Sequence, residues 1–377
     1  MKILAIDDQQ LILLSVEKKL KESGYEVATA TSGQEGIRLF ETFQPHLVIM
    51  DMNMPGMSGL QVIQKLKEKN TDVPIMVMSG NNEEQVILHG FEMGIVDYLK
   101  KPIGLDEMVA RVKRTIGTPK LTQAKTSSES KMIQKHCVGV IIPCYNEADR
   151  LSGDEFVNFA QQNPGYHLCF VNDGSTDSTL QVLQQIRKGN EDSISIYDCK
   201  QNGGKAEAVR QGMLFLSKDK QFDCFGYLDA DLSTDFADLN ELVRTLENSN
   251  YKIVSGSRIS RMGADIAKES ARKIISKSIN LIIQKILGMP FRDTQCGAKV
   301  MKPSIVADVF AKPFKTRWLF DVEIFIRMRK IYGKAAASKF ICEQPLKRWI
   351  HADGSKLSMK DSIKIIWQLG LLSLKYK

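Results

Sequence analysis

The sequence lacks any uncharged run that approaches the roughly 18–20 apolar residues needed to cross a bilayer. Acidic residues appear as early as Asp7 and Asp8, so we expect no signal peptide. The seven cysteines include no CxxC pair, which argues against a zinc site or a disulfide framework and is typical of a reducing cytoplasm. Internal repeats, low-complexity tracts and nucleic-acid-binding motifs are also missing, and we expect no nucleic-acid partner.

Charge is spread unevenly over the 377 residues, a length that predicts two or three domains. Residues 1–118 contain 13 basic and 16 acidic side chains, a net charge of −3, whereas the remainder has a net charge of +11. We therefore expect the C-terminal part to meet an anionic partner, such as nucleotide phosphates, lipid phosphates or a membrane surface.

Residues 1–118 alternate short apolar runs with segments of helical periodicity. Five such βα units predict a doubly wound parallel sheet, whose functional site lies at the carboxyl ends of the strands. The predicted strands are Ile3–Ile6, Tyr25–Thr29, Leu47–Met50, Ile75–Met78 and Ile95–Tyr98, and the predicted helices include Leu11–Ser23 and Gln34–Phe43.

Polar residues follow four of these strands. Asp7 and Asp8 follow the first strand, Asp51 the third, Ser79 the fourth and Lys101 the fifth. Three carboxylates can hold Mg²⁺, and one of them can then attack a phosphoryl group. The lysine and the hydroxyl can bind the transferred oxygens.

This arrangement resembles a response-regulator receiver domain over all of residues 1–118. The resemblance implies that Asp51 is the phospho-acceptor and that a histidine kinase or phosphotransfer protein is its partner. The alternative is a degenerate receiver that serves only for docking or homodimerisation. The implied Mg²⁺ site is formed by Asp7, Asp8, Asp51 and the backbone carbonyl of Asn53, and the implied switch residues are Ser79, Tyr98 and Lys101.

Residues 119–135 are rich in Lys, Gln, Ser and Thr and lack apolar periodicity, which predicts a flexible linker. A continuous helix through Lys131–Lys135 is the alternative. The second domain then occupies residues 136–377.

In this second domain, the apolar run Cys224–Leu228 ends in two carboxylates, Asp229 and Asp231. Within a strand, side chains two residues apart point to the same side, so both carboxylates can aim at one point. Their repulsion requires a cation between them, and a hard divalent ion bound to a diphosphate meets that need. The alternative is a solvated turn after a strand.

Further predicted strands lead to residues that suit nucleotide binding. Val138–Pro143 runs into Tyr145 and Glu147, and Leu168–Asn172 into Asp173. Ile194–Tyr197 precedes Gly203–Lys205, where glycines before a helix and a lysine in its first turn suit phosphate binding. Ile253–Ser257 leads to Arg258. Taken singly, each segment also fits an ordinary turn or a solvated side chain.

Together, and in this order, the segments resemble the catalytic domain of glycosyltransferase family 2, which has the GT-A (Rossmann-like) fold. Over essentially all of 136–377 the resemblance narrows to the dolichyl-phosphate (polyprenyl-phosphate) glucosyl- and mannosyltransferases. It is carried by Gly256–Arg258, Arg272, Asp293–Lys299, Phe320–Glu323, Trp349 and Gly354–Lys356, although Ala298 stands where that family commonly has Phe.

The resemblance implies transfer of a hexose from a nucleotide-sugar to a polyprenyl phosphate, with Mn²⁺ or Mg²⁺ and with inversion. Because a phosphate monoester has a second pKa of about 6, such an acceptor is already anionic and needs no strong base. The implied residues are Pro143, Tyr145, Glu147, Asp173 and Lys205 for the nucleotide-sugar, Asp229 and Asp231 for metal and diphosphate, Arg258, Arg272 and Arg348 for phosphates, and Gln295, Asp321 and Glu323 for the acceptor and sugar.

Two alternatives stay open. The same fold can transfer sugar to a non-lipid hydroxyl acceptor, with Asp321 or Glu323 as the base. Otherwise the chain is a non-catalytic phosphorelay signalling protein.

Two segments combine apolar and basic residues. Ala267–Leu287 is expected either to lie in a membrane interface or to pack on its own domain. The uncharged core of the tail, Ile365–Leu374, has ten residues and cannot span a bilayer, so it predicts an interfacial anchor, with an oligomer contact as the alternative. We therefore expect a cytoplasmic protein that is peripheral on the inner face of the cytoplasmic membrane.

Overall fold

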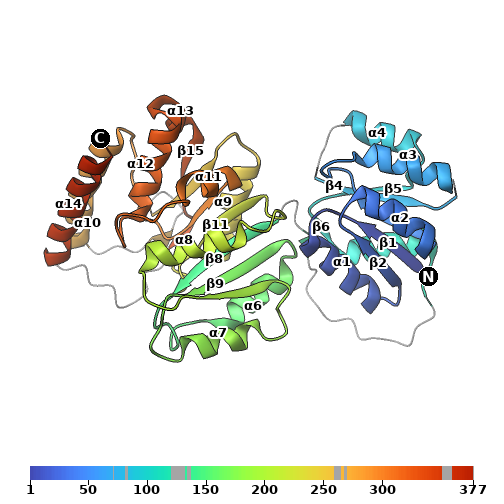
Figure 1. The fold of residues 1–377 in the computed structure, drawn as a ribbon, viewed down its shortest axis with the longest axis horizontal. Helices are drawn as coiled ribbons and strands as arrows, with labels where there is room; N and C mark the ends of the chain where they lie inside the picture. Colours follow the sequence, from blue (N-terminus) through green and yellow to red (C-terminus); the bar gives the residue numbers. More distant parts are fainter. Residues whose placement is uncertain are drawn as a thin grey trace. The chain divides into compact units, whose positions relative to one another are not determined.

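The computed structural model describes residues 1–70, 72–80, 84–119, 132–133, 137–258, 265–266, 270–349 and 359–376 (Figure 1). The chain divides into two compact units, and each is described by itself. The first comprises Met1–Cys137 with Asn158–His167, and the second comprises Val138–Val157 with Leu168–Lys377.

The first unit contains the predicted parallel sheet, with strand order β2-β1-β3-β4-β5. Its central strands β3 and β4 are buried along their whole length because helices cover both faces of the sheet, with α1 against α5 and α2 against α3. Local caps start two of these helices: Ser32 accepts from the Glu35 amide, and Ser58 forms a capping box with Gln61. The elements are β1 (Lys2–Ile6), α1 (Gln10–Glu22), β2 (Glu26–Ala30), α2 (Gly33–Phe43), β3 (Leu47–Asp51), α3 (Gly59–Lys69), β4 (Ile75–Ser79), α4 (Glu84–Glu92), β5 (Asp97–Lys100), β6 (Ile103–Gly104), α5 (Leu105–Ile116) and β7 (Met132–Ile133).

The described part of the predicted linker includes two residues that pair with the first unit. Met132–Ile133 forms β7, which lies antiparallel to β6. Residues 120–131 and 134–136 lie outside the described residues.

The second sheet has seven strands in the order β10-β9-β8-β11-β14-β12-β15. Strands β8, β9, β11 and β15 of this sheet are labelled in Figure 1. It is mixed, because β14 runs antiparallel to both β11 and β12. The elements are β8 (Val138–Cys144), α6 (Gly153–Gln162), β9 (Tyr166–Asn172), α7 (Thr179–Arg187), β10 (Ile194–Asp198), α8 (Lys205–Leu216), β11 (Cys224–Tyr227), α9 (Phe236–Glu247), β12 (Ile253–Ser257), β13 (Asp265–Ile266), α10 (Ser270–Leu287), β14 (Lys299–Met301), α11 (Pro303–Val309), α12 (Phe320–Tyr332), α13 (Lys334–Phe340), β15 (Ile341–Pro345), β16 (Arg348–Trp349) and α14 (Met359–Lys375).

Two features of this sheet differ from the sequence predictions or extend them. β11 ends at Tyr227, so Asp229 and Asp231 lie beyond the strand, and the prediction that strand geometry aligns their side chains is wrong. The sequence analysis also missed β14 and β15. Among the described residues, none of the helices is both long and apolar enough to cross a bilayer.

Candidate functional sites

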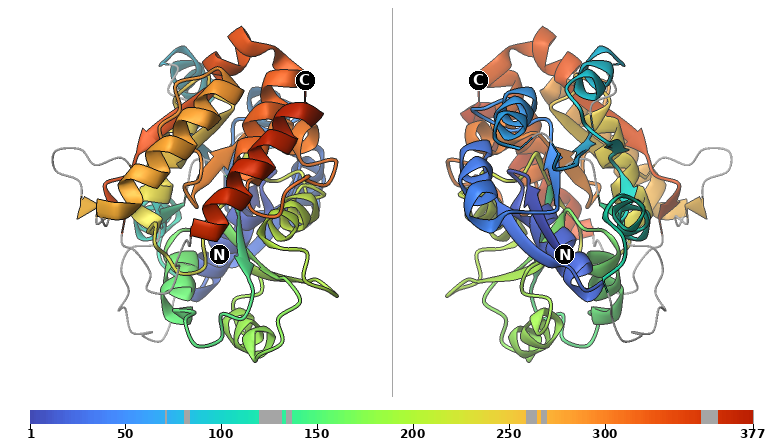
Figure 2. Two further views of the ribbon diagram at one scale, coloured as in Figure 1. Left: turned by 90° about the vertical axis from the view of Figure 1, so that its left-hand side faces the viewer. Right: turned by 90° about the vertical axis from the view of Figure 1, so that its right-hand side faces the viewer.

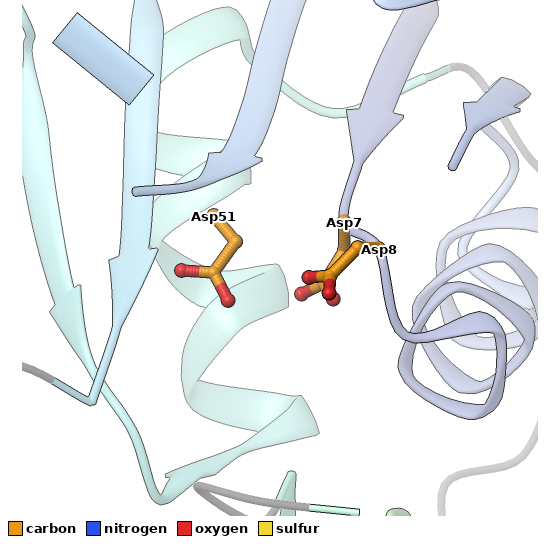
Figure 3. A group of neighbouring side chains, drawn as sticks. All are labelled: Asp7, Asp8 and Asp51. Atoms are coloured by element: carbon orange, nitrogen blue, oxygen red, sulfur yellow. The ribbon is translucent and has the colours of Figure 1, made fainter. Parts of the chain in front are cut away.

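Three carboxylates meet at the carboxyl edge of the first sheet. Asp7 and Asp8 follow β1, Asp51 ends β3, and one oxygen from each lies within 4.8 Å of the others (Figure 3). Hard carboxylate oxygens at this spacing are the ligands that Mg²⁺ prefers. The residues present therefore fit the predicted magnesium site.

Lys101 supplies the positive charge that balances these carboxylates. Its Nζ donates to Oδ2 of Asp7 at 2.7 Å and to Oδ2 of Asp51 at 3.0 Å, and its side chain is 1% exposed. Burial opposes the charge of Lys101, but the two carboxylates more than compensate and raise its pKa. Burial also raises the pKa of Asp7, an effect that Lys101 partly offsets. The lysine thus lies where it can bind a phosphoryl group attached to Asp51.

The remaining predicted switch residues lie beside Asp51. Its Oδ1 accepts from the Asn53 amide at 3.1 Å, and the Asn53 side chain donates to the Ser79 hydroxyl at 3.2 Å. Burial raises the pKa of Tyr98, while a hydrogen bond with Ser79 acts in the opposite direction. All of the predicted receiver residues are therefore brought together at one edge of the sheet.

In the second sheet, Asp229 and Asp231 lie in the turn after β11 and have different partners. The Asp229 carboxylate forms an ion pair with Nζ of Lys205, the first residue of α8. Asp231 is exposed, and its Oδ1 accepts from the Ser233 amide at 3.0 Å. Asp231 is thus the more accessible of the two for a metal ion, and Lys205 already provides a cation for Asp229.

Gly203 and Gly204 do not offer their amides to a phosphate. Both donate to the carboxylate of Asp173, each at 2.8 Å. The amide of Ala206 in the first turn of α8 donates to the carbonyl of Arg317 at 3.2 Å. The prediction that these backbone amides bind phosphate is therefore not supported by the geometry. Within this segment, the side chain of Lys205 is the group that can contact a phosphate.

Asp173 itself is buried, and burial raises the pKa of its carboxyl group while the two glycine amides act against that shift. The positive charge of Arg317 acts in the same direction as the amides. The stem of Arg317 also lies against Gly204, whose φ of +84° suits a residue without a side chain. Sequence analysis missed Arg317, which comes more than 100 residues later in the chain.

The other predicted nucleotide-binding residues gather where β8 ends. Pro143 belongs to β8 itself, and Tyr145 beyond it is 46% exposed. The Glu147 amide donates to Thr179 at 2.8 Å, and its carboxylate pairs with Arg150 at 2.8 Å. These contacts hold the β8–α6 connection against the start of α7.

Asp321 is buried in a charge network that the sequence analysis did not foresee. Lys299, whose side chain is fully buried, donates to Oδ1 of Asp321 at 2.6 Å and to the Cys296 carbonyl at 2.8 Å. The Tyr227 hydroxyl donates to the same Asp321 oxygen. Burial and the neighbouring Asp321 raise the pKa of Tyr227. Because Tyr227 ends β11, the network holds the strand that leads to Asp229.

Glu323 is likewise occupied by internal partners. Oε1 accepts from Nη2 of Arg327 at 2.8 Å and from the Tyr376 hydroxyl at 2.5 Å, while Oε2 accepts from the Lys315 amide at 2.8 Å. The side chain of Glu323 is fully buried. The geometry therefore places both Asp321 and Glu323 in supporting contacts, and their predicted catalytic role stays a prediction.

Two predicted arginines are oriented by carboxylates. Arg258 follows β12 and donates through Nε and Nη2 to both oxygens of Asp293 at 2.7 and 2.8 Å. Burial opposes its charge, but Asp293 outweighs burial and raises the pKa of Arg258. The exposed Arg348 is held by its backbone, because both oxygens of Asp238 accept from the amides of Lys347 and Arg348 at 2.9 Å.

The block Asp293–Lys299 surrounds these contacts. A Cβ atom on Gly297 would overlap the Asp229 carboxylate, so the block lies directly against the acidic turn. Gln295 has a buried Nε2 that finds no hydrogen-bond partner among the described residues, and its predicted role on the acceptor side stays a prediction. Arg272 lies in α10, but its side chain and all of Gly354–Lys356 lie outside the described residues.

Comparison with known proteins identifies both parts of the chain. A family model described as response regulator receiver domain matches residues 3–113, and one described as glycosyl transferase family 2 matches residues 139–310. A dolichyl-phosphate beta-glucosyltransferase of Dictyostelium discoideum is 31% identical over 254 residues, which cover 63% of this chain and 74% of that protein.

The similarity of the first unit is to regulatory proteins. The transcriptional regulatory protein PrrA of Mycobacterium bovis is 39% identical over 129 residues, which cover 34% of this chain and 55% of PrrA. A receiver domain protein from Clostridium thermocellum, solved by crystallography, is 30% identical and covers 30% of this chain and 93% of its own, with a TM-score of 0.30. The predicted fold classes are confirmed, and the chain belongs to glycosyl transferase family 2, with a response regulator receiver domain in its N-terminal part.

Proposed function

We propose that this chain is a phosphorylation-regulated glycosyltransferase that moves a hexose from a nucleotide-sugar to a polyprenyl (dolichyl-like) phosphate by inverting displacement. The relative whose name specifies a dolichyl-phosphate acceptor supports this acceptor class. The observation that carries it is the burial of Asp321 and Glu323 in ion pairs with Lys299 and Arg327.

The burial of these two carboxylates indicates which kind of acceptor the site can use, because only a hydroxyl acceptor needs a general base. Transfer to a sugar or protein hydroxyl needs a base, and these two carboxylates are the predicted candidates. Asp321 accepts from the buried ammonium of Lys299 and Glu323 accepts from Arg327, so both carboxylates are already engaged within the protein. A phosphate monoester is already anionic at neutral pH and needs no such base. The geometry thus favours a phosphate acceptor over a hydroxyl.

On the donor side, charged residues surround the position expected for the diphosphate. The ammonium of Lys205 forms an ion pair with Asp229. A bound diphosphate would give this ammonium a second anionic partner. Asp231 is the residue expected to hold Mn²⁺ or Mg²⁺, whose charge would stabilise the diphosphate as it leaves. Arg258 uses Nε and Nη2 to hold Asp293, and its other guanidinium N–H groups could donate to phosphate oxygens.

The receiver site supplies the proposed regulation. A histidine kinase or phosphotransfer protein would phosphorylate Asp51, and Lys101 would then exchange its contact with Asp7 for the phosphoryl oxygens. Ser79 and Tyr98 would follow, because both are hydrogen-bonded next to Asp51. A peripheral position on the cytoplasmic membrane would bring the transferase to its lipid acceptor.

The test is transfer of labelled hexose from UDP-glucose or GDP-mannose to polyprenyl phosphate in the presence of Mn²⁺. We expect labelled lipid from the wild-type chain and none from Asp231→Asn, whereas Asp219→Asn, which changes an exposed carboxylate elsewhere, should behave as wild type. Transfer to hydroxyl acceptors alone would favour the non-lipid alternative. Donor binding without any transfer would favour the non-catalytic one. Equal rates of hexose transfer with and without acetyl phosphate would contradict only the proposed regulation by phosphorylation.

A further inference from the structure

The three most exposed large apolar side chains of the described residues lie on two neighbouring helices. Leu374 is 69% exposed, Leu281 66% and Trp367 65%, and all three belong to α10 or α14. Solvent contact of three such side chains is unfavourable, and a cluster of this kind commonly marks an interaction surface.

In α14 the exposed residues form a stripe opposite the packed one. Ile365, Leu369 and Leu372 are buried, and their spacing places them on one face of the helix. Trp367 and Leu374, seven residues apart, lie on the other face, together with the partly exposed Leu371. The helix is therefore apolar on both sides, although only one side is covered by the protein.

α10 repeats this arrangement. Ile279, Ile283 and Leu287 are buried at spacings of four residues. Leu281 and Lys285, four residues apart, are both exposed on the opposite face.

The outward faces of the two helices are turned to the same side of the domain. α10 and α14 lie side by side, as both views show (Figures 1 and 2). Each is also bound to α12: Arg329 donates to the carbonyls of Ile286 and Leu287 in α10, and Tyr376 after α14 donates to Glu323. Because the two helices pack beside each other and the C-terminal end of each is held to α12, we treat their outward faces as one surface, which we call the α10–α14 face.

The charge of these helices indicates what covers this surface. Their sequences contain seven basic residues and one acidic residue, and the exposed Lys285 and Lys375 lie next to Leu281 and Leu374. Apolar side chains with a tryptophan, flanked by lysines, suit the boundary between anionic headgroups and acyl chains. An anionic lipid surface meets both requirements, whereas a second copy of this basic face would meet like charge.

We propose that the α10–α14 face docks on the surface of an anionic phospholipid bilayer, with Trp367, Leu374 and Leu281 inserted among the headgroups. The biological role of this docking rests on the proposed function, because a polyprenyl phosphate acceptor is itself held in a bilayer. Binding to the bilayer does not require the acceptor or the donor, so the two proposals can fail separately.

The test is cosedimentation of the full chain with vesicles of phosphatidylcholine and phosphatidylglycerol in equal amounts, without polyprenyl phosphate or sugar donor. We expect binding to these vesicles, little binding to pure phosphatidylcholine, and weakening by salt. Trp367→Ser and Leu374→Ser should each lower the partition coefficient about tenfold, since each removes one buried apolar side chain. Trp318→Ser, which changes a tryptophan 59% exposed elsewhere in the same unit, should bind as the wild type does.

Circular dichroism establishes that each variant is folded before its binding is compared. Wild-type protein that stays in the supernatant, or Trp367→Ser that binds equally well, would overturn the proposal. Dimerisation that is lost in Trp367→Ser, without vesicle binding, would assign the face to a second copy instead. Transfer to a short, water-soluble prenyl phosphate tests the proposed function alone, and Trp367→Ser should retain that activity.

Discussion

The backbone of Gly297 lies against the carboxylate of Asp229, a contact that is possible because position 297 has no side chain. Any Cβ atom there would overlap the carboxylate and force it away from Lys205. The block around Gly297 therefore sets the position of the acidic turn, although Gly297 and Asp229 are 68 positions apart in the sequence.

Gly297→Ala is expected to lower kcat/KM of transfer about a hundredfold, because small displacements of catalytic groups have effects of that size. Donor binding measured by calorimetry should weaken in parallel. Gly370→Ala is the matched control: it lies in α14 with open space at its Cβ position and should bind donor as the wild type does. Undiminished donor binding by Gly297→Ala would contradict this role for the contact.

Lys299→Met is expected to destabilise the second unit by about 3–5 kcal/mol, because it leaves Asp321 buried without its cation. The double variant Lys299→Met with Asp321→Leu should recover much of this loss, since neither charge then remains. Urea unfolding followed by tryptophan fluorescence measures this directly, because all three tryptophans lie in residues 318–367 of the second unit. Strictly additive losses would show that the pair is not coupled.

The first unit was predicted well because its information is local. The central strands are short apolar runs, and functional residues end these strands or follow directly after them, as Asp51 and Asp7 do. Parallel strands then bring these residues to one edge without any knowledge of distant contacts.

The second site depends on pairings between distant residues, which a single sequence does not display. Lys299 and Asp321 are 22 positions apart, and β14 was missed because it is three residues long and begins with that lysine. The lysine inside the apolar run Ala298–Met301 was the one local indication of a buried cation. Asp229 and Asp231 were wrongly placed on a strand because Leu228, which precedes them, is apolar and buried, yet the strand ends at Tyr227.

Asp238→Ala is expected to raise the KM for the lipid phosphate while leaving donor affinity unchanged, because Asp238 fixes the backbone amide of Arg348. Without its carboxylate, two backbone amides lose their acceptors and Arg348 loses its orientation. Glu241→Ala is the control, since Glu241 lies on the same helix and forms ion pairs with the exposed side chains of Arg244 and Lys347. A loss of donor affinity equal to the loss for acceptor would indicate a general structural defect.

Asp51→Asn is expected to abolish labelling of the chain by acetyl phosphate and Mg²⁺, because the amide cannot act as the nucleophile. Intact-mass spectrometry measures the added phosphoryl group. Asp106→Asn, which removes an exposed carboxylate paired with Lys19, should be labelled as the wild type is. Labelling that survives Asp51→Asn would show that another residue is the phospho-acceptor.

Lys101→Ala is expected to make the stability of the first unit depend strongly on Mg²⁺. In EDTA the variant should lose about 3 kcal/mol, because the buried carboxylates of Asp7 and Asp51 then repel each other without a cation. Mg²⁺ should raise its unfolding temperature more than that of the wild type, since the ion replaces the missing charge and binds only the folded site. Lys100→Ala, at the exposed neighbouring position, should unfold as the wild type does in both buffers. Calorimetry that finds the same Mg²⁺ effect in Lys101→Ala and wild type would show that the lysine does not balance these carboxylates.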